Sequence, residues 1–185
     1  MTKKLAGYTL RAATPADEAF LWEMLYQAIH VPVGSAPPPR SLLQEPSLAH
    51  YVAGWGRRPG DLGIIAWQEE SGEAIGAVWL RLFTADDPGW GYVDDHTPEL
   101  SIAIVAEQRG QGLGRALIER VVEAASGKHP ALSLSVDPHN AAFRLYQRLG
   151  FGVVGASGTS VTMRKELTVS VEDGASAYLI RSFHP

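Results

Sequence analysis

The sequence of 185 residues contains no cysteine. A thiolate nucleophile, a disulfide and a cysteine-ligated metal site are therefore excluded. Positive charge is not in excess either: the sequence has 16 Lys and Arg residues and 20 Asp and Glu residues, so the net charge is −4 at pH 7. This balance disfavours a general role on nucleic acid or on a membrane surface.

Long apolar runs are also missing. No stretch approaches the roughly 20 residues that a membrane-spanning helix requires, and the segment Met1–Gly7 has no apolar core of signal-peptide length. We therefore expect a cytoplasmic protein with no membrane partner. The length fits one domain with a substantial core.

A glycine-rich segment, Glu107–Ala116, lies between two patterned runs. The apolar run Leu100–Val105 predicts a strand, and the amphipathic run Leu113–Ala125 predicts a helix. Main-chain N–H groups at such a junction can bind an anion, and glycine lets a phosphate approach closely. The segment lacks the Lys-Ser or Lys-Thr of Walker A and the third glycine of G-x-G-x-x-G. The remaining R-x-x-G-x-G pattern is, by itself, equally compatible with a tight turn.

A second motif follows in Val136–Phe151, which reads as a strand, a loop and a helix that ends in Leu-Gly-Phe. Gly150 takes the position that glycine favours after a helix. The R-x-x-G-x-G pattern followed by N-x-A and L-Y-x-x-L-G-F resembles the GCN5-related N-acetyltransferase (GNAT) superfamily. The two motifs span Pro98 to Gly152, and the order of elements around them matches from Tyr8 to about Leu167.

The resemblance implies an α/β fold of the mixed α+β kind, with a central, twisted, mostly antiparallel sheet of about seven strands and about four helices. It implies one domain at residues 1–167 and a C-terminal extension at 168–185, which adds an edge strand, contacts a partner or is disordered. Patterning predicts strands at Tyr8–Ala12, Leu62–Trp67, Ala74–Phe83, Glu99–Val105, Leu132–Val136, Phe151–Ala156 and Ser160–Arg164, and helices after Thr14 and at Leu48–Trp55, Leu113–Ala125 and Asn140–Leu149.

The activity implied by the resemblance is acetyl transfer from acetyl-CoA, as co-substrate, to a primary amine of a small molecule or peptide. A homodimer is compatible with the family, and no nucleic acid is expected. The alternative is a non-catalytic acyl-CoA-binding sensor. No metal is expected, because adjacent residues such as Asp94, Asp95 and His96 rarely converge on one ion.

Two residues are expected to carry the chemistry by this resemblance. Glu99, at the start of the central strand, matches the general base, which acts directly or through water. Tyr146 matches the general acid that protonates the coenzyme A thiolate. The alternatives are a solvated carboxylate at a strand end for Glu99 and a core aromatic for Tyr146. The presence of both favours the enzyme over the sensor.

Coenzyme binding is assigned to the glycine segment, the central strand and the second motif. Main-chain groups of the segment and the charge of Arg115 would bind the pyrophosphate, and the strand edge would bind pantetheine. Asn140 would contact the coenzyme, cap a helix, or do both. The other residues are Ile102, Ala103, Ile104, Arg109, Gly110, Gln111, Gly112, Leu113 and Gly114.

Three side chains are candidates for acceptor binding. Tyr26 lies on the helix that borders the acceptor pocket in GNAT-like folds. Strand alternation places Trp79 and Arg81 together on the face opposite the aliphatic residues, where a pocket or a covering helix could lie. Core packing for the aromatics and a structural salt bridge for Arg81 are the alternatives.

Overall fold

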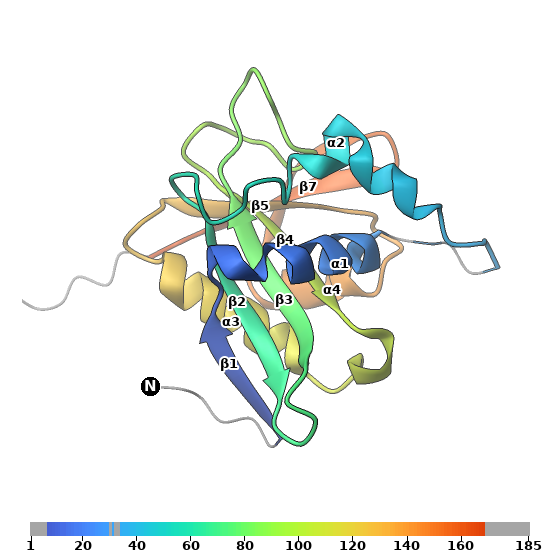
Figure 1. Ribbon diagram of the computed structural model, residues 1–185. Coiled ribbons are helices and arrows are strands. Elements are labelled where there is room, and N and C mark those ends of the chain that lie inside the picture. The colour runs from blue at the N-terminus through green and yellow to red at the C-terminus, as the bar shows by residue number, and fades with distance from the viewer. Residues whose placement is uncertain (1–6, 30, 32–33, 169–185) are drawn as a thin grey trace, which may run out of the picture.

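The computed structural model describes residues 7–29, 31 and 34–168. Its centre is a seven-stranded sheet in the order β1-β2-β3-β4-β5-β7-β6 (Figure 1). Strands β4 and β5 are parallel, and all other neighbours are antiparallel, which confirms the predicted fold. The strands are β1 (Tyr8–Ala12), β2 (Leu62–Gln68), β3 (Ala74–Arg81), β4 (Glu99–Ile104), β5 (Ala131–Val136), β6 (Gly152–Ser157) and β7 (Ser160–Glu166).

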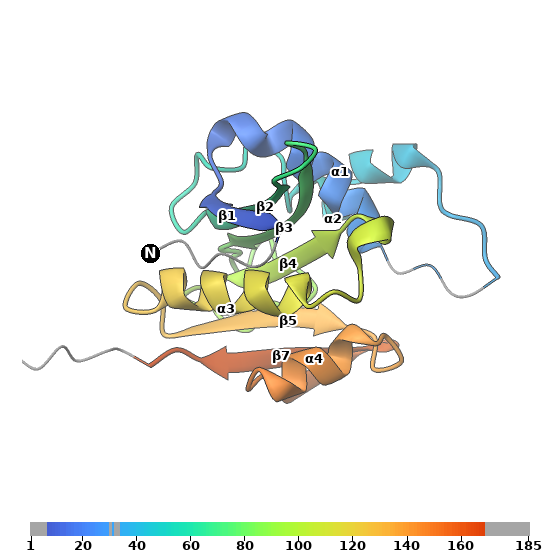
Figure 2. The ribbon, with the colours of Figure 1, turned by 90° about the horizontal axis from the view of Figure 1, so that it is seen from below.

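Four α-helices accompany the sheet in the described part of the chain. Helix α3 lies against β2, β3 and β4, and Figure 2 shows α4 beside β7. Three short 3-10 turns connect them, at Pro15–Asp17, Arg40–Gln44 and Ala106–Gln108. The predicted C-terminal extension covers residues 168–185. Apart from Thr168, it lies outside the described residues. The helices are α1 (Glu18–Ala28), α2 (Pro46–Ala49), α3 (Leu113–Ala125) and α4 (Ala142–Arg148).

The two faces of the sheet bury separate apolar clusters. Val78 and Leu100 pack with residues of α3 and α4 on one face, whereas Trp79 and Ala103 pack with residues of α1 and α2 on the other. This confirms that alternation along β3 separates an aliphatic face from the face that carries Trp79. At β3 both faces are buried because helices cover each of them.

The prediction of a helix over Leu48–Trp55 is wrong, because α2 is a single turn. Gly54 takes a left-handed conformation with φ of 63°, which an α-helix cannot continue. The carbonyl oxygens of His50 and Ala53 accept hydrogen bonds from the Arg81 guanidinium at 2.9 and 2.8 Å. These carbonyls are therefore satisfied by a side chain instead of by a next helical turn.

Strands β4 and β5 separate directly after they meet. Among the described residues they share one paired position, Glu99 with Ser133, where the Ser133 N–H donates to the Pro98 carbonyl at 3.1 Å. By contrast, β4 pairs with β3 along its whole length. Figure 2 shows the two strands diverging toward the start of α3. One edge of β4 is therefore left open.

Candidate active site

The open edge of β4 presents main-chain groups of alternate residues. The Val105 N–H donates to a carbonyl of β3 at 3.0 Å, so the main-chain groups of Ala103, two residues earlier, also face β3. Those of Ile102 and Ile104 face the opening. The Ile104 carbonyl already accepts from Arg109 Nε at 2.9 Å. The Ile104 N–H and both groups of Ile102 are left to pair with an inserted chain.

The glycine segment forms a row of unpaired donors at the start of α3. No main-chain N–H from Gly110 to Arg115 donates a hydrogen bond to a described residue. Gly110 and Gly112 have φ of 78° and 84°, and a Cβ at either position would point into open space. The dipole of the 13-residue α3 adds positive potential at this point. The arrangement fits an anion such as a pyrophosphate.

The two arginines of this segment serve different purposes. Arg109 reaches from Ile104 to α1, where Nη2 lies 3.3 Å from the Gln27 side-chain oxygen, so its side chain braces the segment. Arg115 pairs with Glu119 at 2.7 Å on the surface of α3. The predicted coenzyme contacts of Arg109 and Arg115 stay predictions.

Other contacts fix the segment in place. Leu113 is buried in the core beneath it. Gly114 lies against the end of β4, where an added Cβ would come within 3.5 Å of Ile104. The Tyr8 hydroxyl, from edge strand β1, hydrogen-bonds the side chains of Gln108 and Gln111. The sequence reading missed Tyr8 because nothing in its neighbourhood signals a contact a hundred residues away.

Glu99 is buried at the narrow end of the opening, with 5% of its surface exposed. Its Oε1 accepts a hydrogen bond from the Tyr51 hydroxyl at 2.9 Å, whereas Oε2 is buried and accepts none from the described residues. Burial raises the pKa of Glu99 to about 7, against smaller opposing effects of Tyr51 and the Gly91 main chain. The alternative of a solvated carboxylate is therefore wrong, and the group suits a general base near neutral pH.

A Gly-Trp-Gly turn covers this carboxylate. A Cβ at Gly89 would lie 2.2 Å from Glu99 Oε2, and one at Gly91 would lie 2.9 Å from its carboxyl carbon, so only glycine fits at either position. The Trp90 N–H donates to the Tyr51 hydroxyl at 2.7 Å. The sequence includes Tyr51 among several aromatics that could line an acceptor pocket, but nothing in it links Tyr51 or this turn to Glu99; the two glycines that flank a tryptophan were the available signal for the turn.

Tyr146 lies on α4 and is 7% exposed. Its ring packs edge-on against Phe151 with centroids 6.0 Å apart, and its hydroxyl hydrogen-bonds no described residue. Burial raises its pKa to about 12, so the phenol keeps its proton at neutral pH. The Asn140 side chain accepts a hydrogen bond from the Ala142 N–H at 2.9 Å. It therefore supports the start of α4, in line with the structural role given as an alternative for Asn140.

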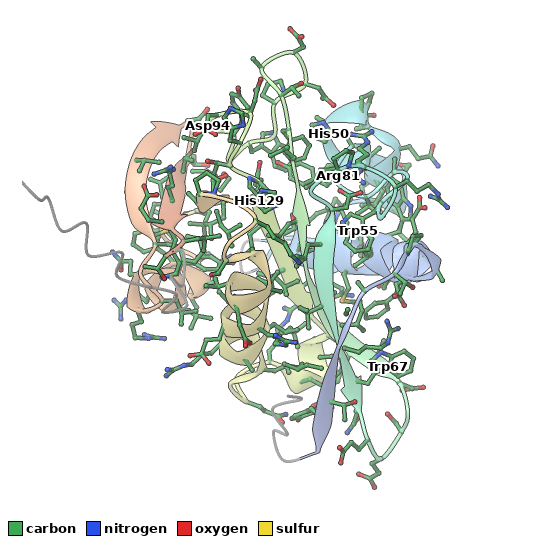
Figure 3. The ribbon with its side chains drawn as sticks, turned by 90° about the vertical axis from the view of Figure 1, so that its left-hand side faces the viewer. His50, Trp55, Trp67, Arg81, Asp94 and His129 are labelled. Atoms are coloured by element: carbon green, nitrogen blue, oxygen red, sulfur yellow. The ribbon has the colours of Figure 1, made fainter. Side chains whose placement is uncertain are left out.

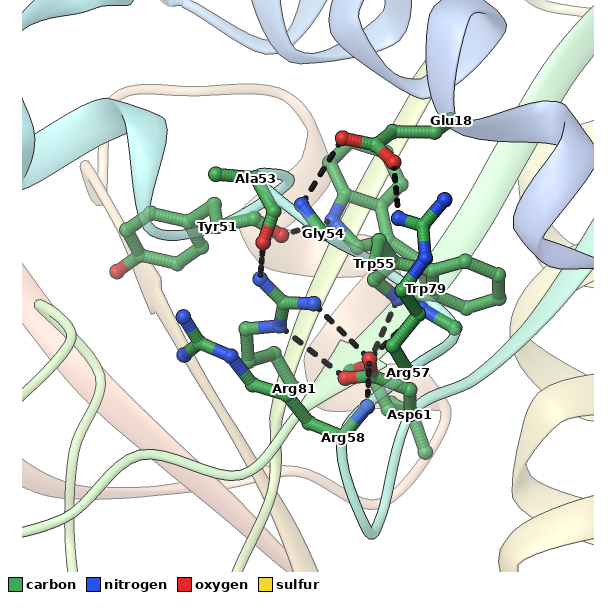
Figure 4. Close-up of polar contacts among 12 residues, drawn as sticks. Glu18, Tyr51, Ala53, Gly54, Trp55, Arg57, Arg58, Asp61, Trp79 and Arg81 are labelled. Atoms are coloured by element: carbon green, nitrogen blue, oxygen red, sulfur yellow. Dashed lines mark hydrogen bonds and ion pairs between the residues drawn. The ribbon is translucent and has the colours of Figure 1, made fainter.

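The predicted substrate contacts of Trp79 and Arg81 are not supported, because both side chains are buried and form hydrogen bonds within the core. Trp79 is fully buried and donates from Nε1 to the Tyr51 carbonyl at 3.2 Å. Arg81 is 1% exposed and binds Asp61 through two hydrogen bonds, at 2.9 and 3.1 Å (Figure 4). Figure 3 shows Arg81 directly beside His50.

The third acceptor candidate, Tyr26, stays a prediction. Its ring is half-buried and carries the Arg40 guanidinium at 4.5 Å from its centroid. Its hydroxyl donates to the Pro38 carbonyl at 2.8 Å. Tyr26 therefore links α1 to the proline-rich loop after it.

Two carboxylates of the loop before β4 bind partners within that loop. Asp94 accepts from the His96 N–H at 2.9 Å, and Asp95 accepts from the Tyr92 hydroxyl at 2.6 Å; Figure 3 shows Asp94 on the β7 side of the loop. Within residues 7–29, 31 and 34–168, no three His, Cys, Asp or Glu side chains are grouped to hold a metal ion. None of the helices seen there is long and apolar enough to cross a membrane.

The chain is similar to known proteins in both sequence and fold. Residues 22–151 match the sequence profile described as the Acetyltransferase (GNAT) family. A 5-NmdU N-acetyltransferase of Pseudomonas phage PaMx11 is 32% identical in an alignment over 103 residues. The coverage of this match is 44% of this chain and 72% of the phage protein.

Solved structures share the fold at lower identity. A GNAT-family acetyltransferase from Streptococcus pneumoniae superposes with a TM-score of 0.58 at 21% identity and covers 86% of this chain and 99% of its own. A phosphinothricin acetyltransferase from Sinorhizobium meliloti, solved with AcCoA, gives 0.57 at 20% identity, with 87% and 89% covered. With its profile match, its phage relative and this shared fold, the chain belongs to the GNAT family of acetyltransferases.

Proposed function

We propose that the protein transfers an acetyl group from acetyl-CoA directly to a primary amine of a small molecule or peptide. The observation that carries this proposal is the buried carboxyl of Glu99, whose pKa burial raises to about 7 and whose Oε2 accepts no hydrogen bond from the described residues. Such a group can take a proton near neutral pH. Membership of the acetyltransferase family supports the reaction class.

The coenzyme binds, in this proposal, across the β4–β5 opening. The unpaired N–H groups from Gly110 to Arg115 hold the pyrophosphate, and the free main-chain groups of Ile102 pair with the pantetheine arm. Asn140 contacts the coenzyme from the start of α4. These N–H donors suit a pyrophosphate because they are aligned at a helix N-terminus and donate to no described residue.

The chemistry then needs three groups of the protein. As the amine nitrogen bonds to the thioester carbonyl carbon, Glu99 takes a proton from that nitrogen, directly or through water. The Ile104 N–H, which no described residue uses, stabilises the oxygen as it becomes negative. The carbon–sulfur bond breaks and the sulfur takes a proton from Tyr146; exchange with solvent restores both side chains.

The test of this function is release of free thiol from acetyl-CoA in the presence of a panel of small-molecule and peptide amines. We expect at least one amine to drive turnover and to gain one acetyl group by mass spectrometry. Tight binding of acetyl-CoA without turnover on any amine would favour a sensor instead. The homodimer and the cytoplasmic location stay predictions.

The pyrophosphate assignment predicts a charge effect at Gly112. Its φ of 84° suits Asn and Asp better than other side chains, and an added side chain enters open space. We expect Gly112→Asp to weaken acetyl-CoA binding by about tenfold or more relative to Gly112→Asn, because a carboxylate then lies beside the phosphates. Calorimetric titration measures both; equal affinities of this matched pair would contradict the assignment.

A further inference from the structure

A directed chain of hydrogen bonds ends on the base. The Trp90 N–H donates to the Tyr51 oxygen at 2.7 Å, and the Tyr51 hydroxyl lies 2.9 Å from Glu99 Oε1. A phenol has a single proton. Because the main chain approaches the Tyr51 oxygen as a donor, that proton points at Glu99.

The ring of Tyr51 cannot turn its hydroxyl elsewhere. The side chain is 4% exposed and is packed among the rings of His50, Phe83 and Trp90, with centroids at 4.8, 4.8 and 5.7 Å. Burial and the nearby charge of Glu99 raise the pKa of Tyr51 far above its ordinary value. The phenol is therefore a permanent donor.

The two oxygens of Glu99 are consequently unequal. Oε1 accepts the Tyr51 proton, whereas Oε2 makes no hydrogen bond of normal geometry with a described residue and lies under Gly89. The Gly91 main chain also lies near this carboxyl, and its effect on the pKa is smaller than that of Tyr51. We propose that Tyr51 is the positioning residue for the base: its hydroxyl fixes Oε1, favours the charged carboxylate and so sets the pH at which Glu99 can take the proton of the amine. This inference rests on the proposed function.

No other side chain hydrogen-bonds this carboxylate in the described part of the chain. Its cross-strand neighbour on β5, Ser133, is uncharged. Three other charged or titratable side chains on the packed elements have partners of their own. These are Arg81 of β3 with Asp61, His50 with Asp87, and Arg164 of β7 with Glu166.

The test is the pH dependence of kcat/KM in Tyr51→Phe. A hydrogen bond to a carboxylate favours its charged form, so its loss should move the acidic limb of the profile upward by about one pH unit or more. Activity at pH 6 then falls about tenfold, while activity at pH 9 approaches that of the wild type. A purely structural role would lower activity by the same factor at every pH.

Tyr92→Phe is the matched control, since it removes a phenol hydroxyl that binds Asp95 rather than Glu99, and its acidic limb should not move. Tyr51→fluorotyrosine keeps the ring and strengthens the donor, so it should shift the limb downward and serves if Tyr51→Phe does not fold. If the acidic limb of the profile is unshifted in both Tyr51 variants while Glu99→Gln is inactive, the role of Tyr51 is overturned and the base assignment stands. Full activity of Glu99→Gln would overturn the base assignment as well.

Discussion

Glu99→Gln lowers kcat/KM for acetyl transfer by about 10²–10⁴-fold, the usual contribution of a general base. The amide has the shape of the carboxyl and keeps an oxygen for the Tyr51 hydroxyl, so the packing under Gly89 is preserved. What it loses is the ability to take a proton. Thiol release under saturating acetyl-CoA measures the rate, and calorimetry should find coenzyme affinity changed by about twofold at most.

Glu123→Gln provides the control, because this carboxyl is 73% exposed at the far end of α3. It should leave both rate and affinity at the wild-type level. Full activity in Glu99→Gln would remove Glu99 from the mechanism. A large loss of acetyl-CoA affinity in that variant would mean that the carboxyl supports the coenzyme site rather than the proton transfer.

The second large effect concerns stability. Asp61→Ala should lower the free energy of unfolding by about 3–5 kcal/mol, because it leaves the Arg81 guanidinium buried without its counter-charge. Both side chains of the pair are 1% exposed. Asp61 also accepts from the Gly56 and Arg58 N–H groups at 2.7 and 3.2 Å, so the turn before β2 loses its anchor too. Urea unfolding followed by circular dichroism gives the value.

An exposed pair supplies the comparison. Glu123→Ala breaks the Arg120–Glu123 contact of 2.8 Å on the surface of α3, and pairs of this kind contribute at most about 1 kcal/mol. If Asp61→Ala cost no more than Glu123→Ala, the pair with Arg81 would not be desolvated. The double variant Asp61→Leu with Arg81→Met should regain only part of the loss, since it removes both charges together but leaves the His50 and Ala53 carbonyls and the Gly56 and Arg58 N–H groups without these partners.

Elements with a clear period and clear ends were predictable from the sequence. Tyr8–Ala12 alternates and Leu113–Ala125 follows a helical period after glycine, and both appear with the predicted bounds. The R-x-x-G-x-G pattern located the row of free N–H groups because that property belongs to the main chain. Local sequence determines such features.

The surroundings of the site were not predictable, because they depend on contacts between distant segments. Alternation placed Arg81 on the correct face, but its partner Asp61 lies at the start of another strand. Tyr51 falls within a stretch whose periodicity predicts a helix, and only the fold brings it to Glu99. The role of Gly89 is invisible without the carboxylate that it covers.

Burial of the Glu99 carboxyl links the folding equilibrium to proton concentration. Its pKa rises from 4.5 to about 7 on folding. Below about pH 4.5 the carboxyl is protonated in both the folded and the unfolded state and costs no stability. Between about pH 4.5 and pH 7 only the folded state keeps the proton. Above about pH 7 it is ionised in both states, and the folded state bears the full penalty of roughly 3 kcal/mol. The protonation state that can accept a proton from the amine is thus the one in which this carboxyl destabilises the native structure most.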